Sequence, residues 1–253
     1  MSVRLEVDGA VATVVLDRPE VRNAVDRPTA EAISAAFDEI DARSDITVAV
    51  LTGAGGIFSA GMDLKAFNAT KERPVCPRRG GFGIVERPPA TPLIAAVEGK
   101  ALGGGFEIAL ACDLVVASED AWFGLPEVRR GLVAAAGGVL RLPRRIPRNV
   151  AMEMVLTGTP ITAQQGRDLG LVNRVVPAGQ ALGAARELAG DIAANAPLAL
   201  RAAKTLVDAS ADWPAEEAFA RQAPHTNLVR TSADAAEGAR AFVEKRPPVW
   251  SGR

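Results

Sequence analysis

Short apolar runs alternate with segments of helical periodicity along roughly the first 180 residues, and this order limits the possible folds more than any other feature. Residues 3–16 read as two strands joined at Asp8-Gly9, where a tight hairpin turn needs positive φ. Apolar residues follow helical spacing over Pro28–Ile40, and TVAVLTG from Thr47 is a continuous apolar run, typical of a strand buried on both faces. We therefore expect a hairpin followed by a strand–helix–strand unit.

The same order recurs further along the chain. LIAAVEG from Leu93 and DLVVAS from Asp113 predict strands, with a helix over Gly104–Ala111 between them. The last expected strand is LVNRVV at Leu171, so the sequence predicts an α/β core over about 180 residues. Residues 66–92, rich in Pro, Arg and Gly, are expected to form a long loop without regular structure that serves as a wall of the substrate pocket.

The rest of the sequence is rich in Ala and has helical periodicity without further strand signals. Helices this short are not stable alone and must pack on something, for which a partner subunit offers a surface. The four expected helices span Ala178–Asn195, Pro197–Ser210, Ala215–Val229 and Ala233–Glu244.

Charge and the scarcity of His and Cys argue against several classes of protein. The 29 basic and 30 acidic residues leave a net charge of -1, so we expect no long-range field that attracts nucleic acid or an anionic membrane. The first residues lack a signal-peptide pattern, and no run approaches the roughly 20 apolar residues of a membrane span, which favours a cytoplasmic location. One histidine (His225) and two cysteines (Cys76, Cys112) argue against a metal site and against a His-activated nucleophile.

The motifs of three other enzyme classes are incomplete or missing. GAGGIF from Gly53 lacks the third glycine of a dinucleotide-binding fingerprint, because Phe58 stands in its place. Gly99-Lys100 lacks both the following Ser or Thr and the earlier glycine of a phosphate-binding loop, and no GxSxG motif occurs. Dinucleotide redox chemistry, nucleotide hydrolysis and ordinary ester hydrolysis are therefore not favoured.

A glycine-rich segment, GKALGGGFEIALACDLVVAS, precedes the helix expected at residue 104. Three consecutive glycines allow close approach to the backbone and leave unpaired N–H groups at the positive end of the helix dipole, which suits an anion. Glu107 falls in the first turn of this helix, and 20 residues later Pro126 and Glu127 open another predicted helix. Each glutamate taken alone is better explained as an ordinary acidic residue of a helix start, as a cap or in contact with solvent.

A third segment, GIFSAGMDLKAF, places Ala60-Gly61-Met62 after the carboxyl end of a buried strand, where α/β proteins bind their ligands. The backbone N–H groups of this segment are candidates for substrate binding. The alternative is a plain surface turn in which Asp63 caps the next helix.

Together these segments make the sequence resemble the crotonase, or enoyl-CoA hydratase and isomerase, family. The likeness extends nearly from end to end, and six segments carry it in family order and spacing: DRPEVRNAV at Asp17, LTGAGGIFSAGMDL at Leu51, PLIAAVEGKALGGGFEIALACDLVVAS at Pro92, FGLPEVRRGL at Phe123, AMEMVLTG at Ala151 and EGARAFVEKR at Glu237. The resemblance implies a crotonase-like spiral of repeated strand–strand–helix units over residues 1–190, which holds the CoA site and the active site. It further implies that residues 191–253 form a helical region that assembles trimers or dimers of trimers.

The resemblance also implies roles for single residues. The backbone N–H groups of Met62 and Gly104 would form an oxyanion hole, Glu127 would donate a proton to carbon, and Glu107 would orient and activate water. The backbone N–H of Ala135 would help to hold that water. CoA would be bordered by Ala60, Gly61, Met62, Asp63, Leu64 and Gly104, and Lys65 either reaches a CoA phosphate or is simply solvated.

Because both glutamates are present, the resemblance implies an enoyl-CoA hydratase, a carbon–oxygen lyase that adds water to a 2-enoyl-CoA thioester. The alternatives are an isomerase that shifts the double bond with Glu127 alone, and a non-catalytic acyl-CoA-binding homologue. Ala134-Ala135 replaces a common Pro-Gly pair and Met62 is bulkier than the usual residue, which leaves the shape of the acyl group open. CoA is part of the substrate, so no separate cofactor and no metal are expected.

Overall fold

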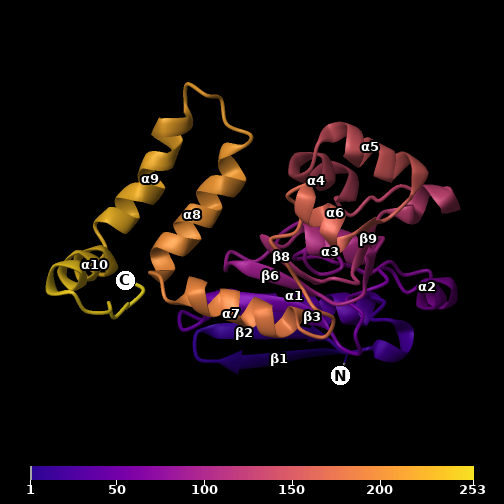
Figure 1. Cartoon of the computed structure of the whole chain (residues 1–253), viewed down its shortest axis with the longest axis horizontal. Helices are drawn as coiled ribbons and strands as arrows, with labels where there is room; N and C mark the ends of the chain where they lie inside the picture. Colours follow the sequence, from indigo (N-terminus) through magenta and orange to yellow (C-terminus); the bar gives the residue numbers. More distant parts are fainter. Residues whose placement is uncertain (1) are drawn as a thin grey trace.

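A six-stranded sheet forms the centre of the computed structural model, which describes residues 2–253 (Figure 1). The strand order is β1-β2-β3-β6-β8-β11, in which β1 (Val3–Asp8) and β2 (Val11–Leu16) form the predicted antiparallel hairpin. Each later strand runs parallel to its neighbours: β3 (Val48–Gly53), β6 (Leu93–Val97), β8 (Leu114–Ser118) and β11 (Arg174–Val176). The predicted strands are confirmed, although β11 is shorter than expected.

The predicted strand–strand–helix repeat is present because the chain passes from this sheet into a smaller one. From β6 it enters β7 (Lys100–Leu102) and then helix α3 (Gly104–Leu110), and from β8 it enters β9 (Trp122–Gly124) and then the 3-10 helix η2 (Pro126–Arg130). A bridge between Ser59 and Ala101 brings the segment after β3 onto the small sheet before α2 (Leu64–Thr70). The small sheet is completed by β10 (Ile161–Thr162), antiparallel to β9.

Both faces of β3 are buried, as its continuous apolar run predicts. Ala49 and Leu51 face the main core, which also contains apolar residues of α1 (Arg27–Ala42). Val48 and Val50 face the opposite way and pack with helix α7 (Ala181–Ala193), which covers the outer face of the sheet (Figure 1). Side chains alternate between the two faces of a strand, so one run of apolar residues supplies both layers.

The prediction that residues 66–92 lack regular structure is wrong. This stretch contains most of α2, then a short hairpin of β4 (Val75–Cys76) and β5 (Gly80–Gly81), then a buried turn. The guanidinium of Arg79 is almost fully buried and forms ion pairs with Asp38 and Asp41 of α1. The Pro and Gly content of residues 66–92 suggested a loop, but these long-range ion pairs hold the segment in place.

Between the small sheet and β11, the structure adds three helices that the sequence analysis did not predict: α4 (Gly138–Arg145), α5 (Arg148–Thr157) and α6 (Ala163–Asp168). Helix α4 packs against α3, and α5 packs against η2. These helices therefore enclose the elements that carry the two glutamates.

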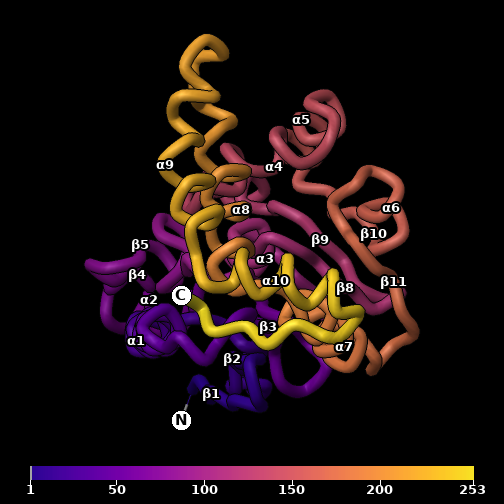
Figure 2. The backbone as a smooth tube through the Cα atoms, turned by 90° about the vertical axis from the view of Figure 1, so that its left-hand side faces the viewer, coloured from indigo at the N-terminus to yellow at the C-terminus, as the bar shows by residue number. Residues whose placement is uncertain are grey.

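The C-terminal helices are α8 (Pro197–Ser210), α9 (Ala218–Arg230) and α10 (Ala233–Glu244), close to the predicted bounds. Helices α8 and α9 lie side by side and project away from the sheets (Figures 1 and 2). The proposed division after residue 190 falls inside α7 and stays a prediction. Within residues 2–253, no helix is long and apolar enough to cross a bilayer.

Candidate active site

Glu107 and Glu127 converge because each follows the carboxyl end of a strand in the small sheet. Strands β7 and β9 are parallel neighbours, and the N–H of Gly103 donates to the carbonyl of Gly124 where both strands end. Glu107 lies in α3 after β7, whereas Glu127 lies in η2 after β9. A Cβ atom placed on Gly103 would lie 3.2 Å from Oε1 of Glu127, so this carboxylate lies beside the start of α3. The two predicted catalytic residues are thus brought to one edge of the sheet.

Aromatic packing holds α3 against β9, the strand that leads into η2. Phe106 precedes Glu107 in α3, and its ring centroid lies 5.5 Å from that of Phe123 in β9, with the rings tilted by 55°. Both rings are almost fully buried. Such a pair contributes about 0.5–1.5 kcal/mol beyond its buried area, which helps to fix the spacing of the two carboxyl groups.

The Glu107 carboxyl is buried, with 3% of the residue exposed. Its Oε1 accepts a hydrogen bond of 2.9 Å from the N–H of Gly138, the first residue of α4. Desolvation, together with the nearby charge of Glu127, raises the pKa of Glu107 to about 7, although the hydrogen bond from the Gly138 N–H acts to lower it. Glu107 does not cap α3, so the helix-cap alternative is wrong.

Glu127 is half-buried, and η2 is a 3-10 helix rather than the α-helix that the sequence suggested. Its buried Oε2 accepts no hydrogen bond from residues 2–253. Burial raises the pKa of Glu127 as well, opposed by the hydrogen bond of its own backbone N–H and by the charge of Arg130. Burial therefore favours the protonated form of both carboxyl groups.

The two expected oxyanion donors lie on backbone segments in contact with each other. A Cβ atom on Gly61, whose φ is 85°, would come within 2.6 Å of the Gly104 nitrogen, so the residue before Met62 packs directly on the start of α3. Neither the Met62 N–H nor the Gly104 N–H donates to any group in residues 2–253, and the N-cap residue Gly103 offers no side chain to them. These free N–H groups suit a partly negative oxygen.

Glycine is required where the two segments meet. The N–H of Ser59 donates to the Lys100 carbonyl, and the N–H of Leu102 donates to the Ser59 carbonyl, which ties the segment to β7. A Cβ atom on Gly105 would lie only 2.1 Å from the Ser59 carbonyl oxygen. The run of three glycines in the sequence therefore reflects close backbone packing as well as a site for an anion.

The residues predicted to border CoA differ in their exposure to solvent. Asp63 caps α2 through the N–H of Ala66, as the alternative suggested, and its carboxylate also pairs with Arg18. Its own N–H donates to the Val25 carbonyl, so neither the side chain nor the N–H is free to bind a ligand. Ala60, Leu64 and Lys65 are exposed at the same edge, and their contact with CoA stays a prediction.

Ala135 is exposed, and its role in holding water also stays a prediction. The sequence analysis did not identify Gly138, whose N–H binds Glu107, nor Phe82, whose ring lies against Gly104. In the sequence, only the double glycine at 137–138 could have pointed to the role of Gly138. Only the glycines on both sides of Phe82 could have pointed to its position against Gly104.

Comparisons with known proteins match the whole chain. A family model described as enoyl-CoA hydratase/isomerase matches residues 6–253. A carnitinyl-CoA dehydratase of Salmonella paratyphi A is 42% identical, with 100% of this chain and 99% of the relative covered. The structure of an enoyl-CoA hydratase from Mycobacterium tuberculosis H37Rv superimposes with a TM-score of 0.97 at 48% sequence identity. The structure of a carnitinyl-CoA hydratase from Mycobacterium avium superimposes with a TM-score of 0.80 at 44% identity. Each alignment covers 100% of this chain and 99% of the other chain.

Proposed function

Because this chain belongs to the crotonase, or enoyl-CoA hydratase/isomerase, family, we propose that it adds water across the 2,3 double bond of a 2-enoyl-CoA thioester. The product is a 3-hydroxyacyl-CoA. The observation that carries this proposal is the placement of two glutamates with raised pKa values beside free backbone N–H donors.

In this proposal each step of the reaction is assigned to one of these groups. The N–H groups of Met62 and Gly104 bind the thioester oxygen, which gains negative charge as the double bond is attacked. Glu107 takes a proton from water while the water oxygen bonds to C3, and Glu127 gives a proton to C2. A proton then returns from Glu107 to Glu127, so atoms and charges balance over the cycle.

The raised pKa values of both carboxyl groups support a site that holds an acid and a base together, whereas the assignment of Glu127 as acid and Glu107 as base rests on the resemblance to the family. Near neutral pH the Glu107 carboxyl, with a pKa of about 7, is still protonated in part of the molecules. An ordinary exposed pair would be fully ionised and would have no proton to give to carbon. The two carboxyl groups and the two N–H donors supply every step, so we propose that no separate cofactor or metal takes part.

The test follows the loss of the conjugated enoyl-thioester absorbance for the wild type, Glu107→Gln and Glu127→Gln, with and without EDTA. We expect each substitution to lower kcat by about 10²–10⁴-fold, while EDTA has no effect. Glu153→Gln removes an exposed glutamate of α5 and serves as the control. Conversion of 3-enoyl to 2-enoyl substrates alone, unaffected by Glu107→Gln, would show an isomerase instead, and CoA binding without any turnover would show a binding homologue.

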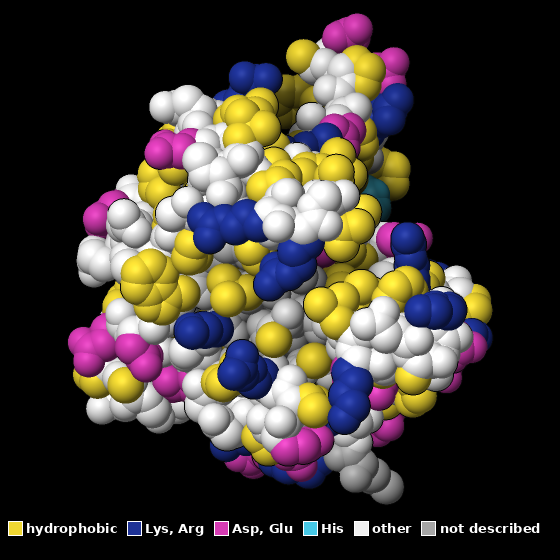
Figure 3. Space-filling model, turned by 90° about the vertical axis from the view of Figure 1, so that its right-hand side faces the viewer, with side chains coloured by type: hydrophobic (Ala, Val, Ile, Leu, Met, Phe, Trp, Pro, Cys, Tyr) yellow, Lys and Arg dark blue, Asp and Glu magenta, His cyan; other side chains and the backbone are white. Residues whose placement is uncertain are grey.

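CoA binding is proposed at the edge formed by residues 60–65. Lys65 is exposed in the first turn of α2, and Figure 3 shows Lys and Arg side chains in the middle of this face, with most Asp and Glu nearer its margins. Such a distribution favours the phosphates of CoA. We also propose a cytoplasmic location, which cell fractionation would test.

A homotrimer or a dimer of trimers is proposed from the exposed apolar side chains of the C-terminal helices. Phe219 of α9 and Phe242 of α10 are 81% and 86% exposed, and a hollow between α8 and α9 is lined by Val207 and Trp213. An exposed apolar surface of this kind marks an interface between proteins, and a second copy of this chain is the proposed partner.

A further inference from the structure

The free N–H of Met62 has its direction fixed by the hydrogen bonds of its neighbours. The Gly61 carbonyl, in the same peptide group as this N–H, accepts from the N–H of Val25 over 2.8 Å. Because a trans peptide is planar, this bond makes the Met62 N–H point the opposite way. On either side, the N–H of Gly61 donates to Oγ of Ser59 over 3.1 Å, and the N–H of Asp63 donates to the Val25 carbonyl over 3.0 Å.

The hydroxyl of Ser59 passes this support on to Asn23. Ser59 is fully buried, and while its Oγ accepts from Gly61 it donates to the Asn23 carbonyl over 2.8 Å. The N–H of Ala60 donates to the carbonyl of Arg22, the residue before Asn23. The segment 59–63 is therefore held by the backbone of residues 22–25.

Two consecutive residues of this supporting segment have a backbone conformation that non-glycine residues seldom adopt. The φ of Arg22 is 57° and that of Asn23 is 52°. Asparagine tolerates the left-handed region better than most residues, whereas a long side chain such as that of arginine rarely occupies it. Such strain persists only where the surrounding structure enforces it, and it is concentrated at functional sites.

The side-chain amide of Asn23 enforces this conformation. Asn23 is buried, with 1% of the residue exposed, and its Oδ1 accepts from the N–H of Arg18 over 2.9 Å. Its Nδ2 donates to the carbonyls of Ala54 over 2.8 Å and Ile57 over 2.6 Å, in the loop after β3. A carboxylate of the same size could accept but not donate, so an amide is required here.

We propose that Asn23 is a positioning residue of the oxyanion hole, which orients the Met62 N–H towards the thioester oxygen through the Ser59 hydroxyl. This inference rests on the proposed hydratase function. Asn23 and Ser59 are buried and direct their hydrogen bonds at protein groups, so they act through Met62 and not by touching the substrate. A donor of this kind acts mainly on the transition state, so its misorientation lowers kcat more than it raises KM.

The experiment compares the wild type with Ser59→Ala and Asn23→Ala in two measurements. For hydration of 2-butenoyl-CoA, we expect kcat to fall by about 10–100-fold in each variant, while KM stays within about threefold. Ser59→Ala removes only the hydroxyl that links Gly61 to Asn23, so it decides the question if Asn23→Ala does not fold.

The second measurement reports on the thioester carbonyl itself. Butanoyl-CoA labelled with ¹³C at C1 has no double bond to hydrate, and difference infrared spectroscopy gives its carbonyl stretching frequency when bound. Hydrogen bonds from an oxyanion hole polarise this carbonyl, so the wild type should lower the frequency below that of the free thioester. We expect a smaller shift in Ser59→Ala and in Asn23→Ala.

Ser118→Ala is the matched control. Ser118 is also fully buried, and its Oγ accepts from the N–H of Gly99 and donates to Asp120, with no hydrogen bond to residues 59–63. This variant should lower the melting temperature but leave kcat and the carbonyl frequency close to those of the wild type.

The outcomes separate this inference from the proposed function. An unchanged carbonyl frequency in Ser59→Ala, a rise of KM alone, an equal loss of the shift in Ser118→Ala, or no shift in the wild type would overturn the inference. Hydration by the wild type would still support the hydratase function in each of these cases. A bound carbonyl that is polarised through Ser59 in a protein that hydrates no enoyl-CoA would instead contradict the function and leave the positioning role in place.

Discussion

The buried carboxyl of Glu107 lowers the stability of the folded protein, and the size of this effect depends on pH. Its carboxyl has a pKa of about 7 in the folded protein and an ordinary value near 4.5 when exposed. The neutral form is favoured in the folded state, so its contribution to stability is present below pH 4.5 and is lost as the pH rises towards 7. Above pH 7 the folded protein must keep a buried charge, at a cost on the order of 1–3 kcal/mol.

Glu107→Gln should therefore stabilise the protein at pH 8 and change it little at pH 4.5. The amide oxygen can still accept the hydrogen bond from the Gly138 N–H, while the buried charge is removed. We expect a gain of about 1–3 kcal/mol in the free energy of unfolding at pH 8, measured by urea denaturation. Glu153→Gln, at an exposed position, should show no such difference between the two pH values. The same gain for Glu107→Gln at both would contradict this explanation.

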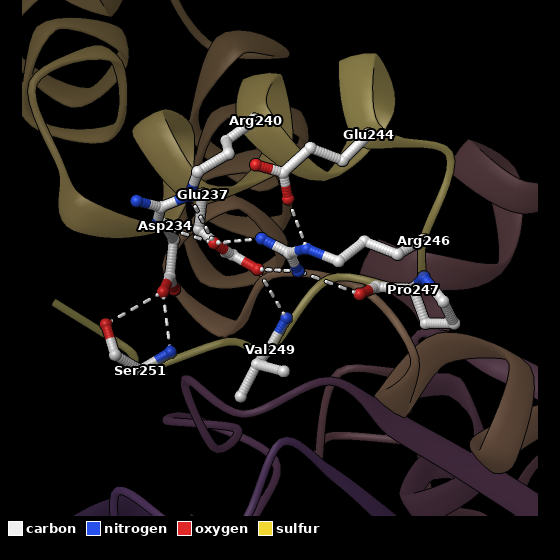
Figure 4. Close-up of polar contacts among 8 residues, drawn as sticks. All are labelled: Asp234, Glu237, Arg240, Glu244, Arg246, Pro247, Val249 and Ser251. Atoms are coloured by element: carbon white, nitrogen blue, oxygen red, sulfur yellow. Dashed lines mark hydrogen bonds and ion pairs between the residues drawn. The ribbon is translucent and has the colours of Figure 1, made fainter.

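At the scale of elements, the C-terminal tail is held to α10 by two buried carboxylates (Figure 4). Glu237 pairs with Arg240 and Arg246 and accepts a hydrogen bond from the N–H of Val249. Asp234 accepts from the backbone N–H groups of residues 251 and 252. The indole of Trp250 then donates to the carbonyl of Ala194, so the tail links α10 to the end of α7.

Glu237→Gln should loosen this tail without unfolding the core. We expect the amides of residues 249–252 to exchange hydrogen about tenfold faster, measured by hydrogen–deuterium exchange. Glu244→Gln is the control, because Glu244 contacts Arg246 but no tail amide. The hydrogen bonds from Arg246 lower the pKa of Glu237. The contribution of Glu237 to the stability of the fold is therefore present above pH 4.5 and is lost as the pH falls below 4.5. Equal exchange in both variants would refute this role.

At the scale of the whole molecule, α8 and α9 form a hairpin of helices with little of its own core. Neither helix contains a fully buried residue, yet ion pairs such as Lys204–Asp113 attach α8 to the sheet region. A pair of short helices exposing large apolar side chains gains stability mainly from further burial. This exposed apolar surface supports the proposed association with a second copy of the chain.

Phe219→Asp should convert the proposed oligomer to smaller species, because a charge would have to be buried at the interface. Sedimentation velocity would measure the change, with the wild type expected as a trimer or hexamer. Gln164→Asp adds the same charge at an exposed position of α6 and should leave the assembly unchanged. A monomeric wild type would contradict the predicted assembly.

The sequence alone determined the type and order of most elements, because apolar periodicity is a local property. It identified both faces of β3 as buried, the bounds of α8 and α10, and the two glutamates. It did not predict α4, α5 and α6, and it treated residues 66–92 as unstructured, because long-range contacts such as Arg79 with Asp38 hold that stretch in place.

Only the tertiary structure decided what the glutamates can do. Glu107 has its raised pKa because residues distant in sequence remove water from it, and its backbone partner Gly138 lies 31 positions away. Phe82 likewise reaches Gly104 only through the folding of β4 and β5 against α1. Helical and strand periodicity depend on neighbours in sequence, so the sequence alone could predict the elements. Desolvation and close approach depend on neighbours in space, so only the tertiary structure could show them.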